Sequence, residues 1–122
     1  MKLLTKSQYD HLIKNGMPEN RDKDHYPVVK LFLPDSACTW LLTELDPEQP
    51  DIAFGLCDLG MGFPELGYVS LEEILSVKGR LGLCVERDLY FRAKFPISVY
   101  AQASRHCQHI TEADSILYLF AE

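Results

Sequence analysis

Runs of apolar residues separated by turn-forming residues predict a small antiparallel sheet in the middle of the chain. The runs cover residues 28–33, 38–45, 52–59 and 65–70. They are bounded by proline, glycine and aspartate, which are typical of turns. The short gaps between runs favour hairpin connections over long crossovers, so we expect an antiparallel meander in chain order.

Pairing Leu45 with Ile52 across their connecting loop predicts the register of the two central strands. One face of this pair is then expected to carry Thr39, Leu41, Thr43, Leu45, Ile52, Phe54, Leu56 and Asp58. On the other face Trp40 lies opposite Cys57, and the next hairpin sets Gly67 beside Cys57. The indole is therefore expected in the core, against small residues, and not as a stacking platform. Both faces are substantially apolar, so helices should cover at least one of them.

Capping signals and helical spacing predict three short helices around this sheet. They cover residues 5–16, 70–79 and 96–107. Thr5 with Gln8 and Ser70 with Glu73 form capping-box patterns for the first two helices. Pro96 opens the third, because proline is tolerated in a first turn. The polar residues 17–27 are predicted to form a loop.

The C-terminal part of the chain is less uniquely patterned. Residues 81–85 and 89–91 predict one or two further strands. Residues 116–120 fit either a last helix, capped by Thr111 and Asp114, or a buried strand, because periodicity cannot separate the two over five residues. We therefore predict one α+β domain over residues 1–122, an antiparallel meander packed by two to four short helices.

Charge is distributed unevenly along the chain. The 122 residues carry a formal net charge of −6, from 12 basic and 18 acidic side chains. Residues 31–77, the acidic segment, contain no Lys, Arg or His. The segment carries nine acids: Asp35, Glu44, Asp46, Glu48, Asp51, Asp58, Glu65, Glu72 and Glu73. The rest of the chain sets 12 bases against nine acids, a net +3. Nucleic-acid binding needs clustered Lys and Arg on one face, and the middle of the chain has the opposite sign, so we expect no direct nucleic-acid binding by this protein.

Several other classes of site are disfavoured by the sequence. The four cysteines lie 19, 27 and 23 residues apart, without zinc-site spacing, and are predicted to be buried thiols. No run of residues is long and apolar enough for a membrane span or a signal peptide, so we expect a cytoplasmic protein. The glycine-rich residues 60–64 lack the Lys-Ser/Thr ending of a phosphate loop, and we predict no cofactor.

Glu44, Asp46, Glu48 and Asp51 are the candidate binding residues, with a basic protein as the expected partner. Carboxylates on one surface can imitate the charge row of a phosphate backbone and steer a basic partner toward it. The competing interpretation is solubility combined with turn chemistry, because three of the four lie at predicted turns.

Asp24, His25, Asp58 and Glu65 form an alternative set of ligands for a divalent metal, or an acid and base pair. This requires residues 17–27 to fold over the end of the sheet. No HxH, HxxxH or HExxH pattern supports the set, and carboxylates beside glycine-rich turns commonly accept hydrogen bonds from backbone amides. We therefore predict no metal site and no catalytic residue.

Four stretches of the sequence carry a resemblance to a known family. They are MKLLTKSQYDHLIKNG at residues 1–16, the loop and strand of residues 20–32, CTWLLTELDPEQPDIAFGLCDLGMGFPELGYVSL at residues 38–71, and GRLGLCVERD at residues 79–88. They resemble a bacterial family described as domain of unknown function 2958. The resemblance covers residues 1–107, and residues 109–122 are a candidate lineage-specific extension.

The resemblance implies a genetic context and carries no catalytic residue over to this chain. Members look like cargo of conjugative plasmids and other mobile elements, near anti-restriction and transfer genes. We therefore expect a non-enzymatic interaction protein that offers its acidic segment to a basic protein engaged in restriction or DNA transfer. The alternative is a small metal-dependent hydrolase or ligand-binding domain. The apolar residues 116–120, if exposed, predict a homo-oligomer.

Overall fold

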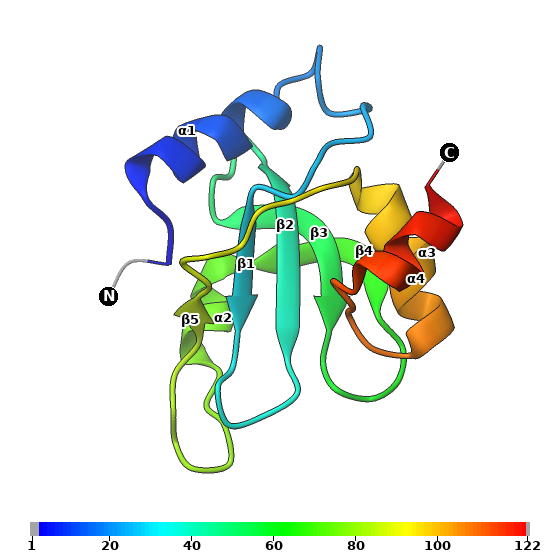
Figure 1. The fold of residues 1–122 in the computed structure, drawn as a ribbon. Helices are drawn as coiled ribbons and strands as arrows, with labels where there is room; N and C mark the ends of the chain where they lie inside the picture. The colour runs from blue at the N-terminus through cyan, green and yellow to red at the C-terminus, as the bar shows by residue number, and fades with distance from the viewer. Residues whose placement is uncertain (1–2, 122) are drawn as a thin grey trace.

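Five antiparallel strands form one sheet, in the order β4-β3-β2-β1-β5 (Figure 1). The computed structural model describes residues 3–121. The strands are β1 (Val29–Phe32), β2 (Thr39–Leu45), β3 (Ile52–Asp58), β4 (Glu65–Ser70) and β5 (Glu86–Arg87). The first four pair in chain order, so the predicted antiparallel meander is confirmed.

The predicted pairing of β2 with β3 is right in the first half of β2 and wrong in the second half. Leu45 pairs with Ala53 and not with Ile52, because the register shifts by one residue next to Glu44. Thr43 lies in this β-bulge. An extra residue in one strand sends every side chain beyond it to the opposite face. The bulge therefore reverses the end of β2 relative to the sequence-based expectation.

Leu45 shows the effect of the bulge on packing. It was expected on the face that carries Leu41, but it packs in the same cluster as Trp40 and Leu42. Trp40 is only 2% exposed, and it pairs with Cys57. The prediction that Trp40 is a core residue is confirmed.

The hairpin between β3 and β4 also closes differently from the prediction. Gly67 pairs with Gly55, whereas the β4 partner of Cys57 is Glu65. The expected position of Gly67 beside Cys57 was wrong by two residues. The loop between the strands closes through Gly60 and has a positive φ there, a left-handed conformation that glycine adopts readily.

The bulge is tied to helix α1 (Lys6–Asn15), which begins with the predicted capping box at Thr5. The buried amide Nδ2 of Asn15 donates a hydrogen bond of 2.9 Å to the Thr43 carbonyl. The next residue, Gly16, lies so close to β2 that a Cβ atom there would be 1.8 Å from the Leu45 carbonyl oxygen. The end of α1 and the end of β2 therefore hold each other in place.

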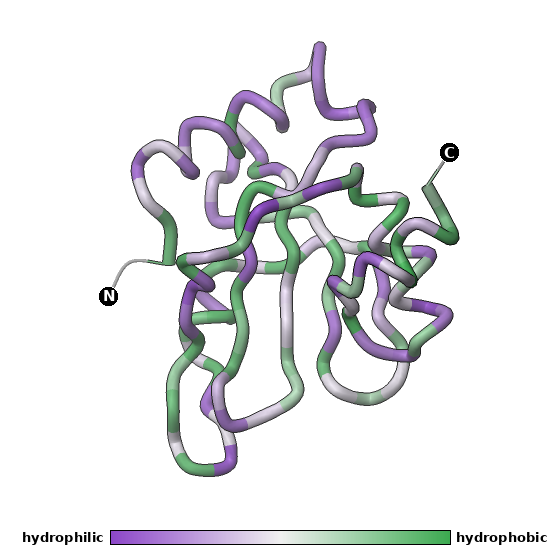
Figure 2. The backbone as a smooth tube through the Cα atoms, in the orientation of Figure 1, coloured by the Kyte–Doolittle hydropathy of each residue, from purple (hydrophilic) through white to green (hydrophobic). Residues whose placement is uncertain are grey.

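Helices cover both faces of the sheet. On one face, Leu12 of α1 and Ile74 of α2 (Leu71–Ser76) pack in the cluster that contains Trp40. On the other face, α3 (Ile97–Cys107) and α4 (Asp114–Phe120) pack over Leu41 and Leu56. Figure 2 shows hydrophobic strands between these helices and a mostly hydrophilic loop after α1, where residues 17–27 were predicted to form a loop.

Three sequence-based expectations outside the meander need correction. Helix α2 ends at Ser76, before the expected stop at residue 79, because Val77 is already extended. Neither residues 81–85 nor residues 89–91 form one of the named strands; β5 covers Glu86–Arg87, between the two predicted ranges, and two residues are too few to give a periodic signal. Residues 116–120 belong to α4, so the strand alternative is wrong.

Within residues 3–121, the structure contains no helix with the length and apolar character of a membrane span.

We predict that Asn15→Ala lowers the free energy of unfolding by about 1–3 kcal/mol, because it leaves a buried carbonyl at the bulge without its donor. Urea denaturation measures this loss. His11→Ala, at an exposed position of the same helix, serves as the control and should change stability by no more than about 0.5 kcal/mol. Equal stability of the two variants would contradict the role of Asn15.

Candidate functional site

The four aspartates of the acidic segment all accept hydrogen bonds from the backbone. Asp46 accepts one from the Glu48 amide at 2.9 Å. Asp51 accepts one from the Glu72 amide at 2.9 Å. The other two, Asp35 and Asp58, accept hydrogen bonds from Leu81, Leu83, Gly60 and Ile110. These carboxylates stabilise turns and connections between elements.

The five glutamates of the acidic segment differ from the aspartates. They are Glu44, Glu48, Glu65, Glu72 and Glu73. In residues 3–121, no hydrogen bond or ion pair involves their carboxylates. The ion pairs of this part of the chain are Lys6–Asp10, Lys30–Asp88, Lys30–Glu112 and Lys94–Asp114, and all use acids outside the acidic segment. Within residues 3–121, the acids of the segment are therefore not neutralised by ion pairs.

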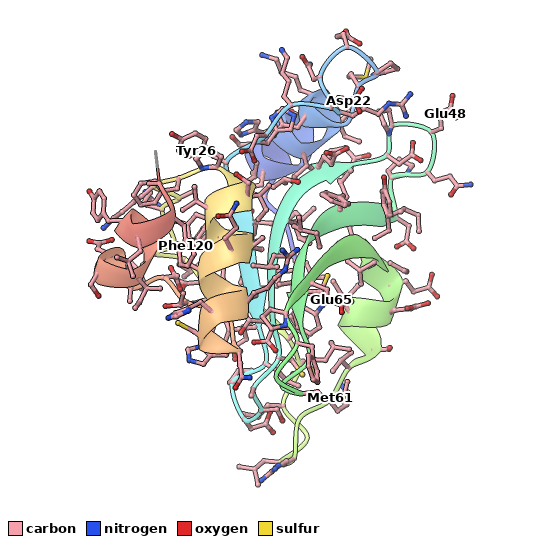
Figure 3. The ribbon with its side chains drawn as sticks, turned by 90° about the vertical axis from the view of Figure 1, so that its right-hand side faces the viewer. Asp22, Tyr26, Glu48, Met61, Glu65 and Phe120 are labelled. Atoms are coloured by element: carbon pink, nitrogen blue, oxygen red, sulfur yellow. The ribbon has the colours of Figure 1, made fainter. Side chains whose placement is uncertain are left out.

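Asp51 brings two acidic parts of the segment together. It lies in the turn between β2 and β3, and its carboxylate also accepts the hydroxyl of Ser70, the N-cap of α2. Glu72 and Glu73, in the first turn of α2, therefore lie beside the hairpin that carries Glu48. We call Glu48, Asp51, Glu72 and Glu73 the acidic corner. Figure 3 shows Glu48 at the tip of this hairpin.

The four predicted binding residues thus divide between roles. Asp46 accepts a hydrogen bond within its own turn, as the competing interpretation expects, whereas Asp51 links its turn to the start of α2. Glu48 is exposed and has no side-chain partner in the part of the chain described. Glu44 lies in a different environment, on the sheet.

Glu44 lies in a row of side chains that crosses three strands. It pairs with Phe54 of β3, which pairs with Tyr68 of β4. The two rings lie 5.1 Å apart between centroids, tilted by 60°. Glu44, Phe54 and Tyr68 line a cleft of about 60 Å³, with Arg21 and Asp46 also in its wall. We call this the Glu44 cleft.

The electrostatic environment of Glu44 is mixed. Burial raises the pKa of its carboxyl, and Asp22 raises it further, while His25 and Arg21 act in the opposite direction. The net shift is upward because desolvation of the carboxylate outweighs the nearby positive charges. No donor within residues 3–121 compensates for this desolvation with a hydrogen bond.

Sequence reasoning missed the aromatic side of this cleft. In the predicted register Glu44 falls on the face opposite Phe54. The bulge at Thr43 brings them to the same face. No local signal in the sequence marks the bulge, because it depends on the contact of Asn15 with a distant carbonyl.

The alternative metal ligands are engaged elsewhere. The carboxylate of Asp24 accepts hydrogen bonds from the amide and hydroxyl of Ser98, in the first turn of α3. The ring Nε2 of His25 lies 2.7 Å from the carbonyl oxygen of Asn20. Both residues therefore hold the loop of residues 17–27 in place.

Asp58 and Glu65, the other two residues of that set, lie in different environments. Asp58 is only 3% exposed. Its two carboxylate oxygens accept hydrogen bonds from the backbone amides of Gly60, at 2.8 Å, and Ile110, at 2.9 Å. Glu65 is exposed at the start of β4 (Figure 3). Within residues 3–121, the structure brings together no group of three or more His, Cys, Asp and Glu side chains that could hold a metal ion.

The cysteines are free thiols, but the prediction that they are buried is wrong. Cys38, Cys57 and Cys107 are half-buried, and Cys84 is exposed. Cys84 lies in the connection before β5, where Lys78 Nζ donates to its sulfur at 2.8 Å. Burial raises the pKa of Cys57 to about 11, so this thiol is a poor nucleophile at neutral pH.

The C-terminal helix buries only part of its apolar surface within the domain. Leu117 is fully buried, and the Tyr118 ring lies 5.2 Å from that of Phe95 between centroids. Tyr118 and Leu119 stay largely exposed. The prediction of a homo-oligomer through the tail therefore depends on these two side chains, and size-exclusion chromatography would test it.

The chain belongs to the family described as "Protein of unknown function (DUF2958)", which it matches over residues 3–111. Helix α4 lies beyond the matched residues. No curated protein and no solved structure matches the chain.

We predict that Asp58→Ala lowers the free energy of unfolding by about 2 kcal/mol or more, because two amides lose a charged acceptor. Asp58→Asn keeps one oxygen and should lose less. Chemical denaturation compares both with Glu65→Ala, which removes an exposed carboxylate that has no partner among the described residues and should have little effect. A similar loss in all three variants would contradict this structural role.

We also predict that Glu44→Gln stabilises the fold at neutral pH. A raised pKa in the folded state means that Glu44 favours folding below its unfolded pKa and loses this contribution as the pH rises through the folded pKa. The charged groups around it are Arg21, Asp22 and His25. Thermal melts should therefore separate the variant from the wild type at neutral pH and converge in acid, whereas Glu48→Gln should show no such pattern. A difference in melting temperature that grows as the pH falls would contradict the predicted direction of the pKa shift.

Proposed function

We propose that this chain is a cytoplasmic, non-enzymatic interaction domain that binds a basic protein through its acidic corner. The observation that carries the proposal is the absence, within residues 3–121, of any ion pair to the nine acids of the acidic segment. Unpaired carboxylates on one part of a surface attract a partner of opposite charge and speed its association.

The proposed partner is a protein that handles nucleic acid in restriction or DNA transfer. Such proteins carry Lys and Arg on the surface that contacts phosphates. A row of carboxylates presents a similar charge to that surface. The resemblance of this family to cargo of mobile elements favours a partner from restriction or transfer, and we propose a mobile element as the genetic context.

The geometry offers less support for the metal-dependent hydrolase. Asp24 and Asp58 are occupied with backbone amides, and catalysis would require a carboxylate that is free to bind a metal or to move a proton. The interaction domain requires no rearrangement, because Glu48, Glu72 and Glu73 are already exposed.

The experiment is a pull-down from bacterial lysate at low and high salt with the triple variant Glu48→Gln, Glu72→Gln and Glu73→Gln. We expect the wild-type chain to capture a basic protein that high salt releases, because screening weakens exposed charge contacts. The triple variant should capture at least about tenfold less, since each neutralised carboxylate removes part of the attraction.

A matched triple variant controls for net charge. Asp10→Asn, Glu19→Gln and Glu86→Gln neutralise three exposed acids outside the acidic segment and change the charge by the same amount. This variant should capture the partner as the wild type does. If both variants capture equally less of the partner, the net charge of the chain explains the effect and the acidic corner is not a specific surface. If all three proteins capture the partner equally, the acidic corner is refuted as the binding surface.

A further inference from the structure

On the premise of that function, we propose that the Glu44 cleft receives an arginine side chain of the basic partner. The acidic corner supplies attraction without shape, whereas the cleft combines a carboxylate with two aromatic rings. Its occupant must therefore be a cation that can also lie on an aromatic face.

The row formed by Glu44, Phe54 and Tyr68 fits this requirement geometrically. Paired residues on neighbouring strands lie side by side on the same face of a sheet, with strands spaced by about 4.8 Å. The two rings are tilted by 60°, so a planar cation can lie flat on only one of them. Lying on the exposed Tyr68 ring with its edge toward Phe54, it would have the Glu44 carboxylate at one end of the row. Tyr68 is 76% exposed, so an occupant can reach its ring without opening the fold.

The chemistry of Glu44 favours a donor of several hydrogen bonds. Its carboxylate is half-buried and accepts no hydrogen bond from residues 3–121. A partly desolvated carboxylate gains most from a charged donor. Guanidinium presents a planar fork of N–H groups to a carboxylate and stacks on aromatic rings, whereas ammonium is compact and strongly hydrated.

Arg21 supports this assignment from within the chain. Its side chain lines the same cleft and lowers the pKa of Glu44. It is exposed, and it makes no ion pair within the described part of the chain. The cleft therefore has a positive charge at its rim but no cation bound to its carboxylate. An incoming arginine would be repelled by Arg21, so removing that charge should strengthen binding.

The test uses acetylated hexa-arginine amide as the probe, with hexalysine and neutral hexacitrulline for comparison. Two-dimensional NMR at low ionic strength follows the backbone amides of the full chain. We expect hexa-arginine to shift the amides of Glu44, Phe54 and Tyr68, hexalysine to bind more weakly and hexacitrulline not to bind. Equal affinity for hexa-arginine and hexalysine would overturn the preference for arginine.

Variants of exposed Tyr68 separate stacking from apolar contact. Tyr68→Phe keeps the aromatic face and should keep the affinity for hexa-arginine. Tyr68→Leu keeps apolar area without the ring, and should weaken binding about threefold, the size expected for an exposed cation–π contact. Equal affinity of Tyr68→Leu and the wild type would overturn the proposal.

Three charge variants complete the test. Glu44→Gln should weaken binding, while Glu65→Gln, an equal charge change at an exposed position of β4, should not. Arg21→Gln should strengthen binding about two- to fivefold, because it removes a like charge near the site. Weaker binding in Arg21→Gln, or equal effects of the two glutamate variants, would overturn the proposal.

The failures of the two proposals are distinguishable. The corner variant is the triple variant Glu48→Gln, Glu72→Gln and Glu73→Gln. If it no longer captures the basic protein but Tyr68→Leu binds hexa-arginine as the wild type does, the cleft is refuted and the interaction function stands. If the corner variant keeps the captured protein while hexa-arginine binds with the predicted pattern, the acidic corner is refuted and the cleft stands.

Discussion

The hydrogen bond from Asn15 to the Thr43 carbonyl is the constraint on which the arrangement of this domain depends. It supplies a partner to a buried carbonyl at the β-bulge, where the ladder between β2 and β3 is interrupted. An unpaired buried carbonyl would cost about 1–3 kcal/mol. With the bulge in place, Leu45 enters the core beside Trp40, and Glu44 turns toward Phe54 on the opposite face. One helix-to-strand contact thus sets both the packing of α1 and the composition of the Glu44 cleft.

Side-chain length divides the acids of the acidic segment into two groups. Aspartate is short, so its carboxylate lies near the backbone of its own turn and accepts amide hydrogen bonds there. Asp46 does this at the start of the β2–β3 connection, whereas Asp51, at the other end, accepts the Glu72 amide in the first turn of α2. Glutamate extends one methylene further, and Glu48 and Glu72 project into solvent without a partner among residues 3–121. Hydrogen bonds to backbone amides, in the same turn or in a neighbouring element, therefore account for the aspartates and leave the exposed glutamates available.

What the sequence could predict follows from the range of the interactions involved. Capping boxes and apolar runs act over a few residues, and they located α1, α3 and the first four strands. The bulge was missed because it depends on Asn15, which lies 28 residues from Thr43. The missed bulge placed Leu45 on the wrong face and hid the contact of Glu44 with Phe54. The sequence could not decide between helix and strand for residues 116–120, because the helix packs Leu117 in the same cluster as residues of α3, and this contact has no local signal.

The acidic corner and the Glu44 cleft act over different distances. Charges on exposed glutamates are felt over about one Debye length, roughly 8–10 Å at physiological salt, and they discriminate only by sign. The proposed cleft would act at contact distance, where the ring of Tyr68 and the position of Glu44 would favour a planar cation. Salt should therefore alter the rate at which a basic partner arrives more than its hold on the cleft, because a half-buried carboxylate is screened less than an exposed one. On the proposed function, the corner would attract many basic surfaces and the cleft would retain the one that presents an arginine at the right position.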